Sequence, residues 1–137
     1  MTSTLNGMND EFPETAAYWQ NLNQGRLTVP HCERCDRYFF PPAPGCPSCG
    51  SPDHLSQREV NGRGVVYSWI VAYFPFDRNF IPEVPFVIAE VQLDEGPRLY
   101  TRLLDVDVTA DFANVGVIVG IRDRDGLPHL ISELVAP

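Results

Sequence analysis

All four cysteines of the chain lie in one short stretch, CERCDRYFFPPAPGCPSCGS, which runs from Cys32 to Ser51. They form two Cys-x-x-Cys pairs, Cys32 with Cys35 and Cys46 with Cys49, separated by only ten residues. Each pair can wrap two sulfur atoms around one ion, and two such knuckles joined by a hairpin supply four thiolates in the tetrahedral arrangement that zinc prefers. The spacing therefore predicts a compact zinc ribbon.

Other uses of paired Cys-x-x-Cys motifs agree less well with this sequence. Rubredoxin-type iron sites share a knuckle such as CPSCG, but their two knuckles generally lie much farther apart. A thioredoxin-like redox pair needs its motif at the start of a helix in a βαβ unit, which this sequence does not predict. Iron is the alternative metal, and four unliganded thiols are the alternative without a metal. Because four thiolates leave zinc no open coordination position, we expect a structural metal that does no catalysis.

Length and charge limit the class of protein. The 137 residues suffice for one ordinary domain, or for a small module and a modest one. A net charge of −8 at pH 7 disfavours phosphate backbones and anionic lipid surfaces, which attract clustered basic residues. The sequence has no apolar run long enough to span a bilayer, and its first residues lack a signal-peptide pattern. We therefore expect a cytoplasmic protein with reduced thiols and no membrane partner.

Local patterns predict a mainly β chain with one N-terminal helix. The segment TAAYWQNLNQG predicts a short helix that Thr15 caps and that Gly25 follows in a left-handed conformation. Tyr18, Trp19 and Leu22 fall on one face of this helix. Seven strands are predicted at Leu27–Val29, Leu55–Val60, Val65–Ala72, Phe86–Leu93, Arg98–Leu104, Val117–Arg122 and Leu127–Leu134. We expect a tail and helix at residues 1–26, a rubredoxin-like zinc ribbon at 27–52, and a five-stranded OB-fold barrel at 53–137.

Turn residues and alternation add detail to the expected barrel. Asp94-Glu95-Gly96-Pro97 and Asp125-Gly126 predict hairpins, because Gly supplies the positive φ that such turns need. Residues 105–115 could carry one helical turn with Thr109 as its cap. The expected core takes one face of each strand and comprises Val66, Trp69 or Ile70, Val87, Ala89, Val91, Leu99, Leu103, Val117, Val119 and Ile121.

No catalytic constellation is evident once the cysteines are assigned to a metal. His31 and His54 adjoin the two knuckles, where exposed positions on the ribbon are the simpler interpretation, and His129 lies alone in the last strand. Pairs of acidic residues near turns are more simply explained as solvated loop charge. Any chemistry would therefore have to be supplied by a partner.

One connector is unusually long and aromatic. The segment YFPFDRNFIPEVPF, from Tyr73 to Phe86, joins two predicted strands and contains three prolines. Connectors of this length usually carry function or are disordered, and aromatic residues argue against plain disorder. We interpret it as a contact surface for a protein partner or an apolar ligand, since interfaces favour Phe, Tyr and Arg. The alternative is a minor core that covers the mouth of the barrel.

The order of these features resembles a known family, the stand-alone zinc-ribbon plus OB-fold proteins associated with acyl-CoA enzymes. The resemblance rests on CERC…PPAPGCPSCGS, GRGVVYSW, PFVIAEVQLDEGPRLYTRL and VGVIVGI, and extends from near Tyr18 to the C-terminus. It implies a non-catalytic accessory subunit that pairs with a thiolase-like, aldolase or hydratase enzyme, braces the complex and helps to form the CoA thioester channel. Asp36 departs from the glycine usual after the first knuckle, but Asp tolerates left-handed geometry.

A CoA thioester would need an apolar channel for its pantetheine arm and a few cations for its phosphates. The resemblance, taken with the aromatic connector, makes six residues candidates for contact with this shared ligand or with the partner: Arg63, Phe74, Phe76, Arg78, Phe80 and Arg98. The main alternative is a module that binds single-stranded nucleic acid, with Tyr67, Trp69 and Tyr73 as stacking platforms. The acidic charge disfavours nucleic acid as a partner. An enzyme active on its own would lack an evident nucleophile.

Overall fold

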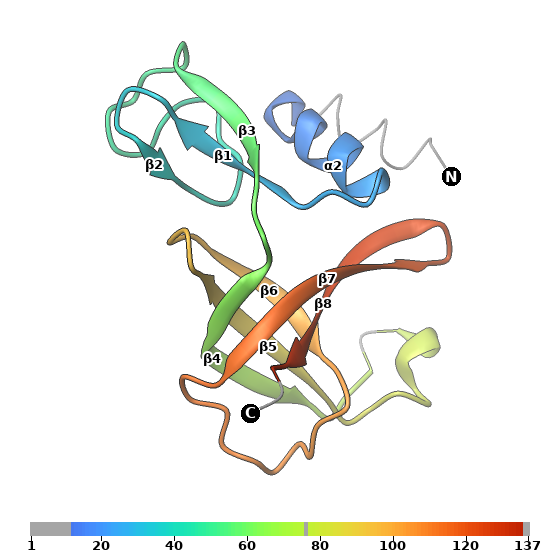
Figure 1. Cartoon of the computed structure of the whole chain (residues 1–137). Coiled ribbons are helices and arrows are strands. Elements are labelled where there is room, and N and C mark those ends of the chain that lie inside the picture. Colours follow the sequence, from blue (N-terminus) through green and yellow to red (C-terminus); the bar gives the residue numbers. More distant parts are fainter. Residues whose placement is uncertain (1–11, 76, 136–137) are drawn as a thin grey trace. The chain divides into compact units, whose positions relative to one another are not determined.

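The structure is a computed structural model that describes residues 12–75 and 77–135 (Figure 1). It is mainly β, with one short helix, a ribbon sheet and a closed five-stranded barrel, which confirms the predicted fold class. The helices and strands, in chain order, are η1 (Pro13–Thr15), α2 (Ala16–Asn23), β1 (Thr28–Cys32), β2 (Arg37–Tyr38), β3 (Leu55–Glu59), β4 (Arg63–Ala72), η2 (Arg78–Phe80), β5 (Phe86–Leu93), β6 (Arg98–Leu103), β7 (Gly116–Arg124) and β8 (Leu127–Leu134). Among the described residues, the helices are too short to form a membrane-spanning segment.

The described residues divide into two compact units. One contains the chain up to Asn61 together with 95–97 and 121–129, and the other contains the remainder of 62–135. In the first unit, Thr15 occupies the position before α2 as predicted, but its hydroxyl donates to the carbonyl of Phe12 (2.7 Å) and does not cap the helix. Gly25 has a φ of 80°, as the sequence indicated.

The sheet of the first unit has the order β2-β1-β3, with β1 antiparallel to both neighbours. The sequence predicts that the strand at Leu55–Val60 lies in the barrel segment. It pairs with β1 instead, over five residue pairs that run from Thr28↔Glu59 to Cys32↔Leu55. The chain then turns at Gly62, whose φ of 82° and close approach to the carbonyl of Val119 exclude a side chain. That turn separates β3 from β4 and explains why β3 stays with the ribbon.

Most of the closed barrel belongs to the second unit, and its strand order is β4-β5-β6-β8-β7. β4, β5 and β6 form an antiparallel meander, and β6 meets β8 in parallel. Eight of the predicted core residues are buried: Val66, Val87, Ala89, Val91, Leu99, Leu103, Val117 and Val119. Trp69 is half-buried while Ile70 is 58% exposed, because a bulge between Val66 and Ser68 shifts the alternation of β4. Ile121 is only half-buried.

The segment 105–115 differs from the prediction. It contains no helical turn, and Thr109 caps nothing. The carboxylate of Asp107 closes a turn instead, because it accepts from the backbone N–H (2.9 Å) and the hydroxyl (2.7 Å) of Thr109. These hydrogen bonds hold the pKa of Asp107 below its usual value. Farther along, Phe112 is buried and meets Trp69 edge-on, with ring centroids 5.6 Å apart.

Candidate metal centre

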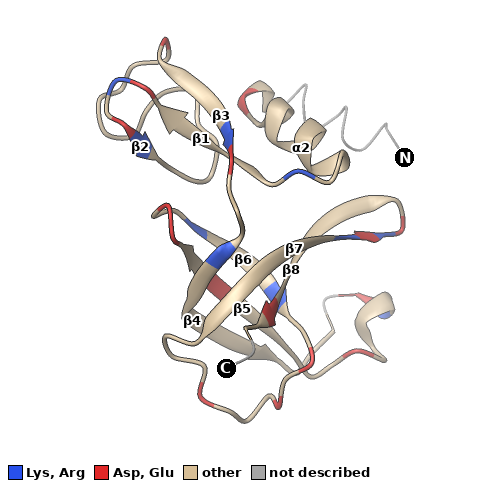
Figure 2. Ribbon diagram, in the orientation of Figure 1, with Lys and Arg blue, Asp and Glu red and all other residues tan. Residues whose placement is uncertain are grey.

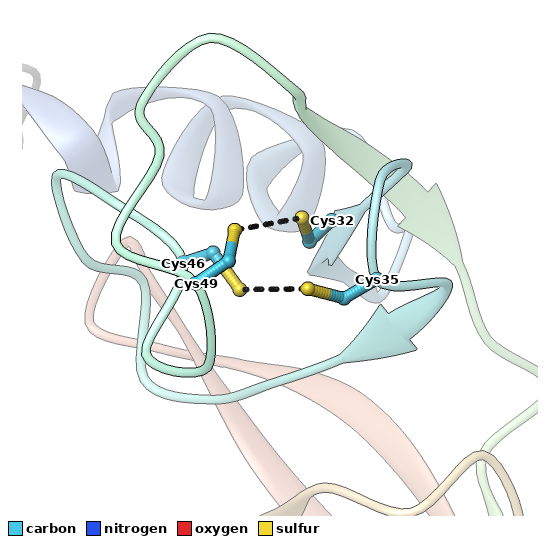
Figure 3. A group of neighbouring side chains, drawn as sticks. All are labelled: Cys32, Cys35, Cys46 and Cys49. Atoms are coloured by element: carbon cyan, nitrogen blue, oxygen red, sulfur yellow. Dashed lines mark hydrogen bonds between the residues drawn. The ribbon is translucent and has the colours of Figure 1, made fainter.

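Three segments of the first unit bring the four cysteines together. Cys32 ends β1, Cys35 lies in the turn before β2, and Cys46 and Cys49 lie in the loop between β2 and β3 (Figure 3). All four sulfur atoms lie within 4.8 Å of one another, with 3.9 Å between Cys32 and Cys49 and 4.0 Å between Cys35 and Cys46. Four sulfurs at a Zn–S distance of about 2.3 Å would be separated by roughly 3.8 Å. The cluster therefore has the size that tetrahedral zinc requires.

Local backbone geometry holds each knuckle in shape. The backbone N–H of Ser48 donates to the sulfur of Cys46 (3.3 Å), and that of Gly50 donates to the carbonyl of Cys46 (2.7 Å). Asp36 has a φ of 52°, so the residue that departs from the family's glycine does adopt the left-handed conformation that we predicted for it. The turns of both knuckles thus point their sulfurs toward one centre.

Without a metal, the thiols of Cys35 and Cys46 have pKa values shifted in opposite directions. Hydrogen bonds from the backbone of Cys49 and of Ser48 lower the pKa of Cys46 to about 6. The side-chain hydrogen bond with Cys49, together with burial, raises the pKa of Cys35 to about 12. Four negative charges this close together repel one another, and a divalent cation removes that cost. The donor set thus fits zinc in chemistry as well as in size, and bound zinc would cross-link the two knuckles.

His31 differs from the expectation that it would be exposed. Its side chain is 1% exposed, because β1 is the central strand of the ribbon sheet. Its Nδ1 lies 3.1 Å from Oε1 of Glu33, its Nε2 lies 3.0 Å from Oδ1 of Asp36, and its ring meets Tyr38 edge-on. Both ring nitrogens are therefore engaged by carboxylates. His54 is exposed, as predicted.

Glu33 links the first knuckle to β3. Its carboxylate accepts from the hydroxyl of Ser56 and from Nη2 of Arg58 (2.5 Å), besides its contact with His31. The hydrogen bond from Ser56, followed by those from His31 and Arg58, lowers the pKa of Glu33 to about 2. Sequence reasoning missed this cluster, since its members become neighbours only through the pairing of β1 with β3.

Five of the six residues expected to contact CoA or the partner are described by the structure, and they lie at several places in the second unit. Arg63 and Arg98 begin β4 and β6. In the aromatic connector, Phe74 is 86% exposed and Arg78 is exposed, whereas Phe80 is half-buried. Phe76 lies outside the described residues.

The connector also folds against one end of the sheet. The ring centroids of Phe80 and Phe86 lie 5.7 Å apart. The guanidinium of Arg102 lies 4.3 Å from the ring centroid of Phe86, and it also pairs with the carboxylate of Glu83 (2.6 Å). Beside these groups is a pocket of about 230 Å³, lined by Pro85, Phe86, Val87, Arg102, Leu103, Leu104, Asp105, Val106 and Val108. Sequence analysis did not single out Arg102, because it sits inside a strand without a motif around it.

Comparison with protein families gives two matches that follow each other along the chain. Residues 19–54 match the family described as "ChsH2, rubredoxin-like zinc ribbon domain". Residues 57–122 match the family described as "ChsH2, C-terminal OB-fold domain".

Several curated proteins are similar in sequence. The chain is 36% identical over 124 residues to a "Probable enoyl-CoA hydratase alpha subunit" of Thermomonospora curvata, covering 90% of this chain but only 37% of that protein. It is 34% identical over 95 residues to a "DUF35 domain-containing scaffold protein" of Methanothermobacter thermautotrophicus, covering 69% of this chain and 71% of the relative.

Two solved structures are similar in fold. A chain of the "Ltp2-ChsH2(DUF35) aldolase" superposes with a TM-score of 0.80 at 32% identity, over 90% of this chain and 95% of that one. A DUF35-family protein of unknown function from Sulfolobus solfataricus superposes with a TM-score of 0.60 over 98% of both chains. At 17% identity, the second similarity shows a shared fold alone.

Proposed function

Since this chain belongs to the DUF35 family of zinc-ribbon and OB-fold proteins, we propose that it is a non-catalytic accessory subunit of an enzyme complex that acts on acyl-CoA thioesters. One observation carries the proposal: the fold and sequence agree over nearly the whole chain with a subunit of a structure named as an aldolase. The hydratase subunit among the relatives supports the same class of substrate by its name.

The chemistry of this chain's own residues supports a role without catalysis. The four cysteine sulfurs face one another, and a zinc ion bound by all of them has no open position for substrate or water. His31, which directly precedes Cys32 in the sequence, is buried and engaged by two carboxylates. The groups that make and break bonds would therefore come from the partner.

For the partner we favour a thiolase-like enzyme, which would supply a catalytic cysteine and histidines for carbon–carbon cleavage or formation. An aldolase or a hydratase of another fold is the alternative. In this arrangement the ribbon and barrel brace the complex, and the chain positions a CoA thioester without reacting with it.

The aromatic connector is our candidate for contact with the pantetheine arm. Phe74 presents an exposed aromatic ring, Phe80 braces the connector against Phe86, and Phe76 lies between them in the sequence. An apolar channel with a few cations suits a CoA thioester, so Arg63, Arg78 and Arg98 are candidates for its phosphates or for the subunit interface.

Co-purification tests the assembly. A tagged chain, isolated from its native cell, should retain a second subunit whose sequence identifies it as an acyl-CoA enzyme, and the pair should turn over a thioester. Isolation of the chain by itself, or with a partner that has no activity on thioesters, would contradict the proposal.

The contribution of the connector is tested in that complex. Phe74→Ser should raise the KM for the thioester or weaken the complex, and it should leave the zinc content unchanged. Phe12→Ser is the matched control, because Phe12 is a partly exposed phenylalanine of the other unit. Unaltered assembly and KM in Phe74→Ser would remove Phe74 from the channel.

A further inference from the structure

The outer surface of β4, β5 and β6 carries an exposed cluster that the sequence analysis did not identify as one surface, although it named Tyr67 and Arg98 separately. We call Val65, Tyr67, Ile70, Arg98 and Tyr100 the barrel face. Tyr67, Ile70 and Tyr100 are 51%, 58% and 69% exposed. Strand pairing places the rows Val65↔Gln92↔Arg98 and Ser68↔Glu90↔Tyr100 side by side on this surface.

These outward positions are more apolar than a solvent-facing sheet requires. Antiparallel sheets with one wet surface usually alternate apolar-in and polar-out residues. In β4 the bulge after Val66 turns the side chain of Tyr67 toward the outside of the barrel. Ile70 also faces outward, and it pairs with Ile88 of β5. The aromatic connector already covers the far end of this surface, where Phe86 is only 7% exposed. The barrel face is the part of this surface that the described residues leave exposed.

One guanidinium at the barrel face has no acidic partner. The Arg98 guanidinium lies 3.5 Å from the ring centroid of Tyr67, and it pairs with no carboxylate among the described residues. Glu90, on the same surface, accepts from the hydroxyl of Ser68 (2.9 Å), and Arg102 pairs with Glu83. Stacking fixes the plane of the guanidinium and leaves its N–H groups available for a carboxylate. Figure 2 shows basic residues on β4 and β6 of a chain whose net charge is −8.

We infer that the barrel face is the docking surface for the catalytic subunit, which presents a carboxylate to Arg98 beside apolar side chains that cover Tyr67, Ile70 and Tyr100. The inference rests on the proposed function and names the surface that the function uses. Tyr and Arg are among the residues that most often dominate the energy of protein interfaces.

Two other occupants agree less well with these observations. A second copy of the chain, related by a two-fold axis through the barrel face, would bring two Arg98 guanidinium groups close together. A nucleic-acid strand would need a basic groove along its backbone, which an acidic chain with a single unpaired arginine at this face does not offer.

Charge reversal provides the first test, measured by calorimetry with the catalytic subunit that co-purifies with the wild-type chain. Arg98→Glu should raise the Kd of the complex by about tenfold or more, as loss of a hot-spot residue does. Arg122→Glu, which reverses an exposed arginine on β7, is the control and should change the Kd by less than about twofold. If Arg98→Glu raises the KM for the thioester without altering the Kd between subunits, Arg98 serves CoA and the inference is overturned.

Photo-crosslinking provides the second test. With Tyr100 replaced by a benzophenone amino acid, illumination should link this chain to the catalytic subunit at a peptide that contains Asp or Glu. The same replacement at Leu127, a partly exposed residue at the start of β8, should not. Links to a second copy or to nucleic acid, or an active complex that yields no link, would overturn the inference and leave the proposed function standing. A wild-type chain that forms no complex would overturn the proposed function itself.

Discussion

At the scale of single residues, the metal centre depends on each of four sulfur atoms in a cluster less than 5 Å across. Cys46→Ser replaces a thiolate by a hydroxyl that does not ionise at neutral pH, so zinc should fall from one ion per chain to well below one. Elemental analysis of the purified protein measures this. Ser48→Ala is the control, because Ser48 contributes only its backbone N–H to the knuckle. Full zinc occupancy in Cys46→Ser, or iron in the native protein, would contradict the assignment.

A second residue-scale prediction concerns the inner surface of the barrel. Val119 is 7% exposed on β7, while its neighbour Ile118 is 41% exposed. Val119→Asp should lower the free energy of unfolding by roughly 3 kcal/mol or more, because a buried carboxylate loses hydration without gaining a partner. Ile118→Asp should cost less than about 1 kcal/mol. Denaturant titration distinguishes the two, and equal losses would show that the strand register is wrong.

Residues whose role is set by spacing along the chain could be predicted, and residues whose role is set by pairing could not. The four cysteines and the left-handed Asp36 follow from local sequence alone. The burial of His31 requires knowing that β1 is a central strand, with Glu33 and Asp36 folding back on both sides of the ring. Whether Trp69 or Ile70 faces the core depends on a bulge between Val66 and Ser68, and the residue types there do not predict that bulge.

At the scale of elements, zinc should stabilise the ribbon more than the barrel. The ribbon sheet contains only three strands, one of them two residues long, whereas the barrel is closed. Because metal binding is coupled to folding in small ribbons, a chelator should release the amide protection of β1 and β2 before that of β4 and β5. Hydrogen exchange with and without chelator tests this. Simultaneous loss of protection in all four strands would argue against separate cores.

The stability contributed by the packing of α2 should decrease as the pH becomes alkaline. Tyr18 is 6% exposed, and burial raises its pKa to about 12. The folded state therefore favours the neutral phenol, so this stabilisation is complete below pH 10 and is lost as the pH rises from 10 toward 12. Between pH 9 and 11 the wild type should lose about 1 kcal/mol more than Tyr18→Phe. All ten basic residues are arginine, so no lysine titrates in this window. Parallel stability curves for the two proteins would show that the phenol is not buried.

Elements bounded by strong turn signals were predicted with nearly the observed limits. Asp125 and Gly126 have the positive φ angles, 53° and 84°, that the hairpin between β7 and β8 requires. The pairing of β3 was missed because its sequence suits a strand in either sheet, and only Gly62 marks the end of the ribbon. The segment 105–115 was misjudged because Asp107 satisfies the backbone of a turn without starting a helix.

At the scale of the whole molecule, the chain combines a four-cysteine metal centre, which would leave zinc no open position, with a closed barrel. This combination suits a scaffold. The spacing of the knuckles, the strand patterns and the hairpin signals were sufficient to predict the architecture from sequence. Function was less accessible, because the identity of a partner is not encoded in local patterns of this chain. The barrel face shows the difference: Tyr67, Arg98 and Tyr100 lie far apart in sequence and become one surface only through the register of β4, β5 and β6.

The most direct test of the central claim is thioester turnover by three preparations: this chain, its co-purifying subunit, and the two combined. This chain alone should show no turnover even with full zinc occupancy, because all four of its cysteine thiolates would then be zinc ligands. The combined subunits should turn over the thioester faster, or with a lower KM, than the partner alone. Turnover by this chain alone, or a partner whose kinetics do not change when the chain is added, would contradict the account.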